Sequence, residues 1–166
     1  GSNLYAGGYF TLAGGVPANY IAKWDGNNWT NLGGGVDSYV YALTHDGSNL
    51  YAGGWFARAG GVLVNYIAKW DGSSWSALGS GMNGRVYALV HDGSNLYAGG
   101  EFTQAGGDPN CKYIAKWDGS SWSAVGYGEN IITSPVYALA WDGSNLYAGG
   151  RFSNIGANTN ARGIAR

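Results

Sequence analysis

The sequence predicts an all-β protein built from repeated four-stranded antiparallel sheets. The first observation behind this prediction is an internal repeat, because the octapeptide Gly-Ser-Asn-Leu-Tyr-Ala-Gly-Gly occurs at Gly1, Gly47, Gly93 and Gly143. The second is composition: 31 of the 166 residues are glycine, 15% are aromatic and only 11% are charged. The third is that no segment of useful length shows the 3.6-residue period of an amphipathic helix.

Four short segments follow one another in each repeat, and the stretch 40–79 shows them in order. Segment 40–45 begins with Val-Tyr-Ala-Leu, and segment 49–56 reads Asn-Leu-Tyr-Ala-Gly-Gly-Trp-Phe. Segment 66–70 reads Tyr-Ile-Ala-Lys-Trp, and segment 75–79 reads Trp-Ser-Ala-Leu-Gly. Short runs of this kind between turn signals are typical of strands. We call the four segments strands A, B, C and D.

Asp-Gly pairs connect strand A to strand B and strand C to strand D. Such pairs favour tight hairpins, because the turn needs a positive φ that glycine adopts at low cost. Four antiparallel strands in a unit of 46–50 residues are typical of a β-propeller blade. A β-sandwich would not repeat so closely in sequence, and a parallel β-helix would use shorter coils. The pairs are Asp25-Gly26, Asp46-Gly47, Asp71-Gly72, Asp92-Gly93, Asp118-Gly119 and Asp142-Gly143.

We therefore predict a single β-propeller segment of four-stranded antiparallel blades over residues 1–166. It contains about 3.5 repeats, with bounds 1–46, 47–92, 93–142 and, for the partial last copy, 143–166. The chain begins at strand B and stops in strand C, so the first and last blades are incomplete. Three interpretations stay open: a stretch of a longer polypeptide, an assembly of several half-propellers, or a lone four-bladed ring. Open edge strands favour a homo-oligomer over a free monomer, because such edges recruit partners.

Two motifs carry a resemblance to known families. Leu-Tyr-Ala-Gly-Gly-x-Phe-Thr-x-Ala-Gly-Gly and Ile-Ala-Lys-Trp-Asp-Gly-Ser-Ser-Trp-Ser-Ala-Leu-Gly resemble the kelch-like propeller repeats of secreted bacterial proteins. They are also similar to propeller repeats of fungal cortical proteins and, more loosely, to delta-60 repeats. The resemblance covers nearly the whole chain and implies a secreted or cell-surface protein with a binding or structural role. It assigns no site residues, and the last copy departs from it at 153–157 and Gly163.

Charge, hydropathy and cysteine content exclude several classes of protein. The net charge of −1 provides no basic surface for nucleic acid, and no run of 18 apolar residues could span a membrane. The single Cys111 excludes an internal disulfide and a cysteine-based zinc site. His45 and His91 occupy one repeat position in successive blades, too far apart to share a metal ion. We expect a structural role for both histidines, no metal and no cofactor.

Positions that differ between repeats predict a binding surface. One set follows the Gly-Gly of strand B, a second lies in the B–C loops, and a third lies in the D–A links at 36–39, 82–85 and 129–135. In an up-and-down sheet these connections emerge on the same face, and loops on a rigid scaffold are where binding residues concentrate. The alternative is that these loops vary because nothing constrains them. The candidate residues for a protein or glycan partner are Tyr9, Trp55, Arg58, Glu101, Gln104 and Arg151.

A lectin is the alternative function, with one sugar site per blade. The tryptophans at the start of strand D could stack on sugars, and their exposure to solvent would support this function whereas burial would remove its best feature. Catalysis is not expected, because nothing in the sequence places two of the non-recurring carboxylates at the separation a glycosidase needs. The candidate stacking residues are Trp29, Trp75 and Trp122.

Overall fold

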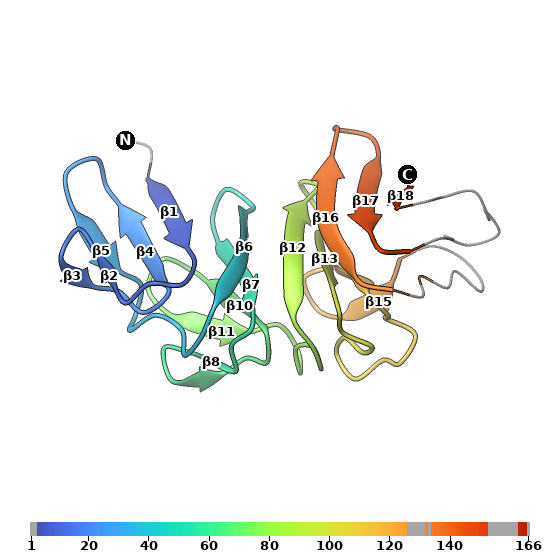
Figure 1. Cartoon of the computed structure of the whole chain (residues 1–166), viewed down its shortest axis with the longest axis horizontal. Coiled ribbons are helices and arrows are strands. Elements are labelled where there is room, and N and C mark those ends of the chain that lie inside the picture. Colours follow the sequence, from blue (N-terminus) through green and yellow to red (C-terminus); the bar gives the residue numbers. More distant parts are fainter. Residues whose placement is uncertain (1–2, 126–131, 133, 153–162, 166) are drawn as a thin grey trace.

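The computed structural model is all-β and describes residues 3–125, 132, 134–152 and 163–165 (Figure 1). Within these ranges every regular element is a strand, and no helix there is long and apolar enough to cross a membrane. The predicted variable link at 129–135 lies outside the described residues except for 132, 134 and 135. The departure of the last copy at 153–157 also lies outside them.

Strand pairing follows the order in which the segments occur in the sequence. The second sheet has the order β6-β7-β10-β11 and the third has the order β12-β13-β14-β15, with every pair antiparallel. These sheets comprise β6 (Val40–His45), β7 (Leu50–Gly54), β10 (Ile67–Trp70), β11 (Trp75–Ala77), β12 (Val86–His91), β13 (Leu96–Gly100), β14 (Ile114–Trp117) and β15 (Trp122–Ala124).

Two three-stranded sheets flank them, and among the described residues no further strand pairs with their edges. The first has the order β1-β4-β5 and the fourth has the order β16-β17-β18. Two short hairpins that the repeat pattern did not predict lie in the B–C loops, β2 with β3 and β8 with β9. These elements are β1 (Leu4–Gly7), β2 (Leu12–Ala13), β3 (Val16–Pro17), β4 (Ile21–Trp24), β5 (Trp29–Asn31), β8 (Arg58–Ala59), β9 (Val62–Leu63), β16 (Val136–Trp141), β17 (Leu146–Gly150) and β18 (Ile164–Ala165).

The Asp-Gly hairpins form as predicted. In the β6–β7 turn, one carboxylate oxygen of Asp46 accepts hydrogen bonds from the backbone N–H groups of Ser48 (2.8 Å) and Asn49 (2.7 Å). Gly47 has a φ of 97°, which side chains of L-residues rarely tolerate. The corresponding aspartates make the same pair of bonds in the other described hairpins. Side-chain capping by aspartate and positive φ at glycine together explain why the pair recurs.

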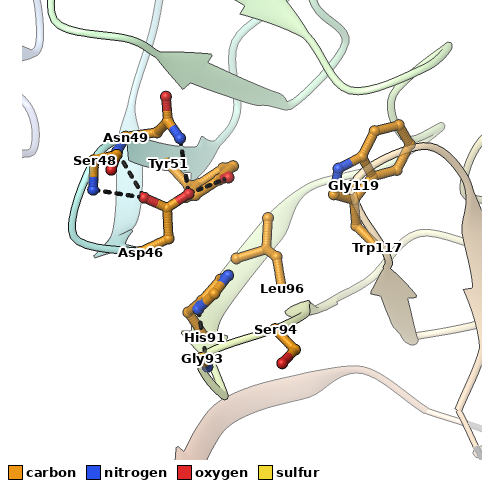
Figure 2. Close-up of a pocket in the computed structure, with 10 residues that line it drawn as sticks. All are labelled: Asp46, Ser48, Asn49, Tyr51, His91, Gly93, Ser94, Leu96, Trp117 and Gly119. Atoms are coloured by element: carbon orange, nitrogen blue, oxygen red, sulfur yellow. Dashed lines mark hydrogen bonds between the residues drawn. The ribbon is translucent and has the colours of Figure 1, made fainter.

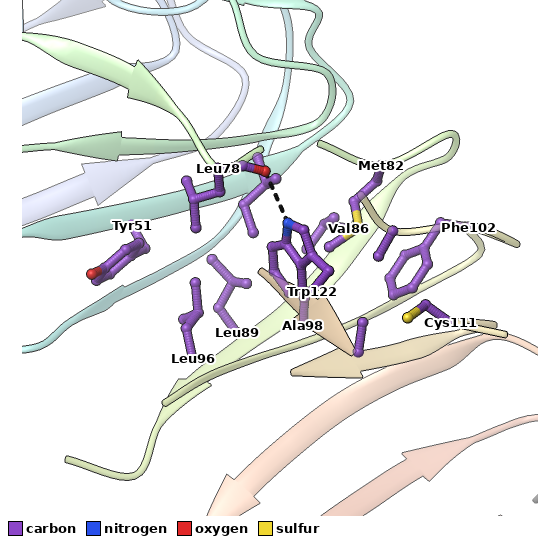
Figure 3. Close-up of a cluster of buried hydrophobic side chains, with 13 residues drawn as sticks. Tyr51, Leu78, Met82, Val86, Leu89, Leu96, Ala98, Phe102, Cys111 and Trp122 are labelled. Carbon is purple, nitrogen blue, oxygen red and sulfur yellow. Dashed lines mark hydrogen bonds between the residues drawn. The ribbon is translucent and has the colours of Figure 1, made fainter. Parts of the chain in front are cut away.

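The hydrophobic core lies between successive sheets. Between the second and third sheets, Leu78 packs with Val86, Leu96 and Phe102, all almost fully buried (Figure 3). Equivalent clusters join the first sheet to the second and the third to the fourth. The strand B phenylalanines Phe56, Phe102 and Phe152 are buried in this core, whereas the first copy, Phe10, is half-buried.

The first glycine of the first three Gly-Gly pairs permits close contact between neighbouring sheets. A Cβ atom on Gly53 would lie 2.5 Å from Cγ1 of Val86, and one on Gly99 would lie 2.6 Å from Cγ1 of Val136. Both distances are below any normal carbon–carbon contact, so only glycine fits. Strand B therefore lies directly against the inner strand of the next sheet. Figure 1 shows the inner strands β6, β12 and β16 side by side in the middle of the molecule.

Candidate functional site

Among the described residues, the variable B–C loops and D–A links are joined by hydrogen bonds and share one face of the molecule, as the strand order predicts. In the second sheet, Asp37 of the preceding D–A link donates its backbone N–H to Arg58 O (3.1 Å), and its carboxylate accepts from the N–H of Arg58. In the third sheet, Asn83 makes the corresponding bonds with Gln104. We call this the variable face, formed by the B–C loops, the D–A links and the residues after Gly-Gly.

One backbone hydrogen bond places each post-Gly-Gly side chain next to a D–A link. Trp55 donates its N–H to Tyr39 O (2.8 Å), and Glu101 donates to Arg85 O (3.0 Å). Arg151 makes the third bond of this series, to Pro135 O (3.1 Å). The bond uses only main-chain atoms, so the side chain at this position can change without disturbing the sheet. This explains how a regular scaffold presents different residues from each repeat.

A continuous series of aromatic rings crosses the variable face. Tyr39 stands at its centre, with its ring centroid 4.7 Å from that of Tyr9, 5.9 Å from Trp55 and 6.2 Å from Tyr41. From there the contacts pass from one inner strand to the next. The ring centroids of Tyr41 and Tyr87 are 5.5 Å apart, and those of Tyr87 and Tyr137 are 5.4 Å apart. We call this series the aromatic row: Tyr9, Tyr20, Tyr39, Tyr41, Trp55, Tyr87 and Tyr137.

Much of the aromatic row faces solvent. The exposed fraction is 74% for Tyr9, 44% for Trp55, 43% for Tyr41 and 45% for Tyr137. Scattered surface aromatics are ordinary, but rings that touch one another form a contiguous apolar patch of the kind that marks interaction sites. The patch spans residues from all four larger sheets, so the packing of those sheets determines its shape.

A charged cluster fixes one side of the aromatic row. The guanidinium carbon of Arg85 lies 4.1 Å from the ring centroid of Trp55, within cation–π distance. The same guanidinium forms an ion pair with Glu101 at 2.9 Å, and the hydroxyl of Tyr87 donates to the other carboxylate oxygen at 2.7 Å. Burial first, and then the bond to Glu101, raise the pKa of Tyr87. The phenol therefore stays protonated at neutral pH and holds the carboxylate in place.

The structure brings three of the six predicted residues into this site. Tyr9 and Trp55 belong to the aromatic row, and Glu101 anchors the charged cluster. Arg58 instead donates to Gly61 O (2.9 Å) at the tip of its own β8–β9 hairpin. The other two, Gln104 and Arg151, lie exposed on the variable face outside the row.

Sequence comparison between repeats missed the strand A tyrosines. Tyr41, Tyr87 and Tyr137 recur at one position, which made them resemble structural residues. Each follows a buried valine at a point where strand A shifts its register against strand B. Such an irregularity re-aims the side chains beside it, so simple alternation along strand A does not report which way these tyrosines face. The repeat pattern contains no signal that marks the register shift.

The predicted sugar-stacking tryptophans require a correction. Trp75 and Trp122 are only 5% and 7% exposed. Trp75 Nε1 donates to Leu32 O (2.7 Å) of the preceding sheet, and Trp122 Nε1 donates to Leu78 O (2.9 Å), a bond shown in Figure 3. Trp29 is half-buried. The strand D position thus joins neighbouring sheets, because the indole combines a large apolar ring with one hydrogen-bond donor. The rings of Trp75 and Trp122 are not available to stack on a ligand.

No metal-binding group and no exposed cysteine accompanies the aromatic row in the described part of the chain. Among the described residues, no group of three or more His, Cys, Asp or Glu side chains could hold a metal ion. Burial raises the pKa of the Cys111 thiol to about 11, and the side chain packs within the core. No protein-family model matches the chain, and no curated protein matches it significantly.

Proposed function

We propose that this chain forms a segment of a non-catalytic β-propeller that binds a protein partner through the aromatic row. The observation that carries the proposal is the contiguous exposed row itself, with Arg85 stacked on Trp55. Tyrosine, tryptophan and arginine are the residue types that dominate binding energy at protein interfaces. Their rings offer a large contact area at low conformational entropy cost.

The blade arrangement is supported by the strand order and by the packing of successive sheets. Each larger sheet is antiparallel and presents its inner strand to the inner strand of its neighbour. The motif resemblance to kelch-like repeats agrees with this arrangement. It also supports the proposal that the protein is secreted or exposed at the cell surface.

A scaffold function also fits the electrostatics of the carboxylates. In the described hairpin turns, the aspartates with lowered pKa values accept hydrogen bonds from backbone amides, so stabilisation of the turn explains the shift. Glu101 is bound by Arg85 and Tyr87. These carboxylates therefore have structural partners and need no catalytic explanation.

Selection of peptides on the immobilised chain tests the proposal. A phage-displayed library of random peptides is selected on the wild-type chain, and the affinity of the enriched peptides is measured for Trp55→Ala. Loss of a central interface aromatic costs about 2 kcal/mol or more, which is about 30-fold in affinity. Leu63→Ala is the matched control, because Leu63 is exposed on the same face but lies outside the row. Peptides that bind Trp55→Ala as tightly as the wild type would contradict the proposal, as would the absence of any enriched peptide.

Homo-oligomers through open edge strands stay a separate proposal. The edges of the first and fourth sheets carry backbone groups that a second copy could pair with. Light scattering at several concentrations should then give a mass that is a multiple of 17.3 kDa. A constant monomer mass would contradict assembly and leave the aromatic row as the interaction surface.

A further inference from the structure

A cavity recurs between successive sheets on the face opposite the variable face. This face carries the A–B and C–D hairpins, and we call it the hairpin face. The cavity between the second and third sheets has a volume of about 340 Å³, and the one between the first and second sheets about 330 Å³. Both volumes fall within the range of small-ligand pockets, about 300–1,000 Å³. Figure 2 shows the first of these cavities.

The two cavities are lined by the same residue types at equivalent positions of successive repeats. In the cavity of Figure 2, one wall comes from the A–B hairpin and strand B of the second sheet. The other wall comes from the third sheet, from its strands A, B and C and its A–B and C–D hairpins. The cavity therefore forms only where the two sheets pack against each other. The shared positions are Asn49, Tyr51, His91, Ser94 and Trp117 in this cavity, and Asn3, Tyr5, His45, Ser48 and Trp70 in the other.

The histidine presents a hydrogen-bond donor. Nδ1 of His91 accepts the backbone N–H of Gly93 (3.0 Å), and Nδ1 of His45 accepts that of Gly47 (3.2 Å). A ring nitrogen that accepts a hydrogen bond carries no hydrogen, so in the neutral ring the other nitrogen, Nε2, is the donor. The ring of His91 also stacks on Tyr51, with centroids 6.1 Å apart, which fixes its orientation. The structural role expected for the histidines is thus accompanied by a free donor at each cavity.

Other polar groups of the lining are also uncommitted. The Nδ2 of Asn49 donates to Asp46 (2.8 Å), which leaves the amide oxygen as an acceptor. Ser94 bonds through its backbone N–H (2.7 Å), and no bond of its hydroxyl occurs among the described residues. Nε1 of Trp117 is turned toward the middle of the cavity (Figure 2). In the described part of the chain, Arg85 Nε is the only buried side-chain nitrogen or oxygen atom without a hydrogen-bond partner, so Nε1 of Trp117 is not such an atom.

The lining offers no free charge. Asp46 reaches the cavity, but its carboxylate accepts four hydrogen bonds, from the backbone of Ser48, from the backbone and side chain of Asn49, and from the hydroxyl of Tyr51. Burial and the bond to this carboxylate raise the pKa of Tyr51 to about 12, so the phenol is neutral. Neutral donors and acceptors beside an aromatic ring suit a ligand that has hydroxyl groups and an apolar ring face.

We propose that each of these two cavities binds one neutral sugar unit, so that the hairpin face binds a glycan at repeated positions. In the cavity of Figure 2 the indole Nε1 of Trp117 is a further donor, and Trp70 occupies the same position in the other cavity. The serine hydroxyl, the histidine Nε2 and the asparagine amide oxygen exchange hydrogen bonds with its hydroxyl groups. This site is independent of the proposed protein-binding function, because it lies on the other face and uses other residues.

The test uses an array of neutral glycans ending in glucose, galactose, mannose or N-acetylglucosamine, followed by calorimetric titration of the full chain with the glycan that binds best. We expect two sugar units bound per chain. His91→Phe keeps the ring that stacks on Tyr51 but removes the Nε2 donor, so it should reduce the stoichiometry to one. The double variant His45→Phe/His91→Phe should lower binding at least tenfold, while its near-ultraviolet circular dichroism stays that of the wild type.

Trp55→Ala is the matched control on the variable face. It should leave glycan binding unchanged, whereas the histidine variants should leave the binding of selected peptides unchanged. The proposal is overturned if no neutral glycan on the array binds. It is also overturned if a bound glycan is lost with Trp55→Ala but retained by the double histidine variant.

Discussion

At the scale of single residues, the strand B glycines and the two tryptophan positions show that contact with a neighbouring sheet determines what a residue contributes to stability. Gly53 and Gly149 occupy the same place in an identical pentapeptide, yet only Gly53 lies against a valine of the next sheet. Trp122 donates its Nε1 to the preceding sheet, while Trp117 does not share this bond. Identical sequence therefore has different energetic roles in different repeats, and substitutions can measure the difference.

Gly53→Ala should lower the free energy of unfolding by about 1–3 kcal/mol, because the added methyl group would overlap Cγ1 of Val86 in a well-packed core. Gly149→Ala is the matched control, since the nearest atom to its Cβ would lie 3.6 Å away, an ordinary contact. Urea unfolding of both variants checks the prediction. Equal destabilisation by the two substitutions would show that intersheet contact is not the reason for the glycine.

Trp122→Phe should cost about 1–2 kcal/mol, because the carbonyl of Leu78 loses its donor in a buried site. Trp117→Phe removes the same N–H group where it reaches solvent, and we expect a smaller change in the free energy of unfolding. Thermal unfolding of the two variants at equal concentration makes the comparison. A larger loss for Trp117→Phe would contradict the assigned roles.

At the scale of elements, the aspartates of the Asp-Gly hairpins make the free energy of unfolding depend on pH. Burial alone would raise the pKa of Asp92, but the backbone N–H groups of Asn95 and Ser94 and the side chains of Asn95 and Tyr97 hold it at about 2. An aspartate with a depressed folded pKa stabilises the fold above its unfolded value, about 3.9, and this contribution is lost as the pH falls toward the folded value. The hairpins should therefore weaken between about pH 4 and pH 2.

Asp92→Asn isolates one such hairpin. Asparagine keeps an acceptor for the turn but loses the charge and the second acceptor oxygen, so the variant should be less stable than the wild type at pH 7. The difference should shrink at pH 2, where the wild-type carboxylate becomes protonated. Denaturant unfolding at both pH values measures it. A difference that stays constant would show that the charge of Asp92 does not contribute to the turn.

At the scale of the whole molecule, the core consists of layers between sheets, so the sheets in the middle of the described structure are covered on both sides. Strands β7, β13 and β17 have the identical sequence Leu-Tyr-Ala-Gly-Gly. Leu50 and Leu96 are buried, whereas Leu146 is half-buried. In stacked repeats each unit is stabilised by its neighbours, and outer units open first.

Native-state hydrogen exchange of the 166-residue chain should therefore be slower in β7 and β13 than in β17. The three strands share one sequence, so their intrinsic exchange rates within the pentapeptide agree and the comparison needs no further correction. Equal protection of all three would indicate that the four sheets open as one cooperative unit. That result would contradict a core divided into layers.

The strands, the antiparallel pairing and the hairpins could be predicted from sequence because each rests on local chemistry. Alternation, Asp-Gly turns and repetition act over a few residues, and repetition confirms each signal several times. The variable face could also be predicted, since the connectivity of an up-and-down sheet places its loops without further information. The site residues were only partly predictable, because strand A tyrosines look structural in a repeat comparison and because Trp75 and Trp122 could equally have been exposed.

The sequence by itself determined an all-β chain, the order of its strands and the position of its variable loops. Only the tertiary structure decided which aromatic side chains meet, because the aromatic row and the hairpin-face cavities are assembled from residues of different repeats. The distance between such residues depends on how closely one sheet packs on the next, and that packing is set by glycine–valine contacts 33–37 residues apart in the chain, such as Gly53 with Val86 and Gly99 with Val136. No local pattern reports a contact of that range, and so the functional surfaces became visible only once the sheets were in place.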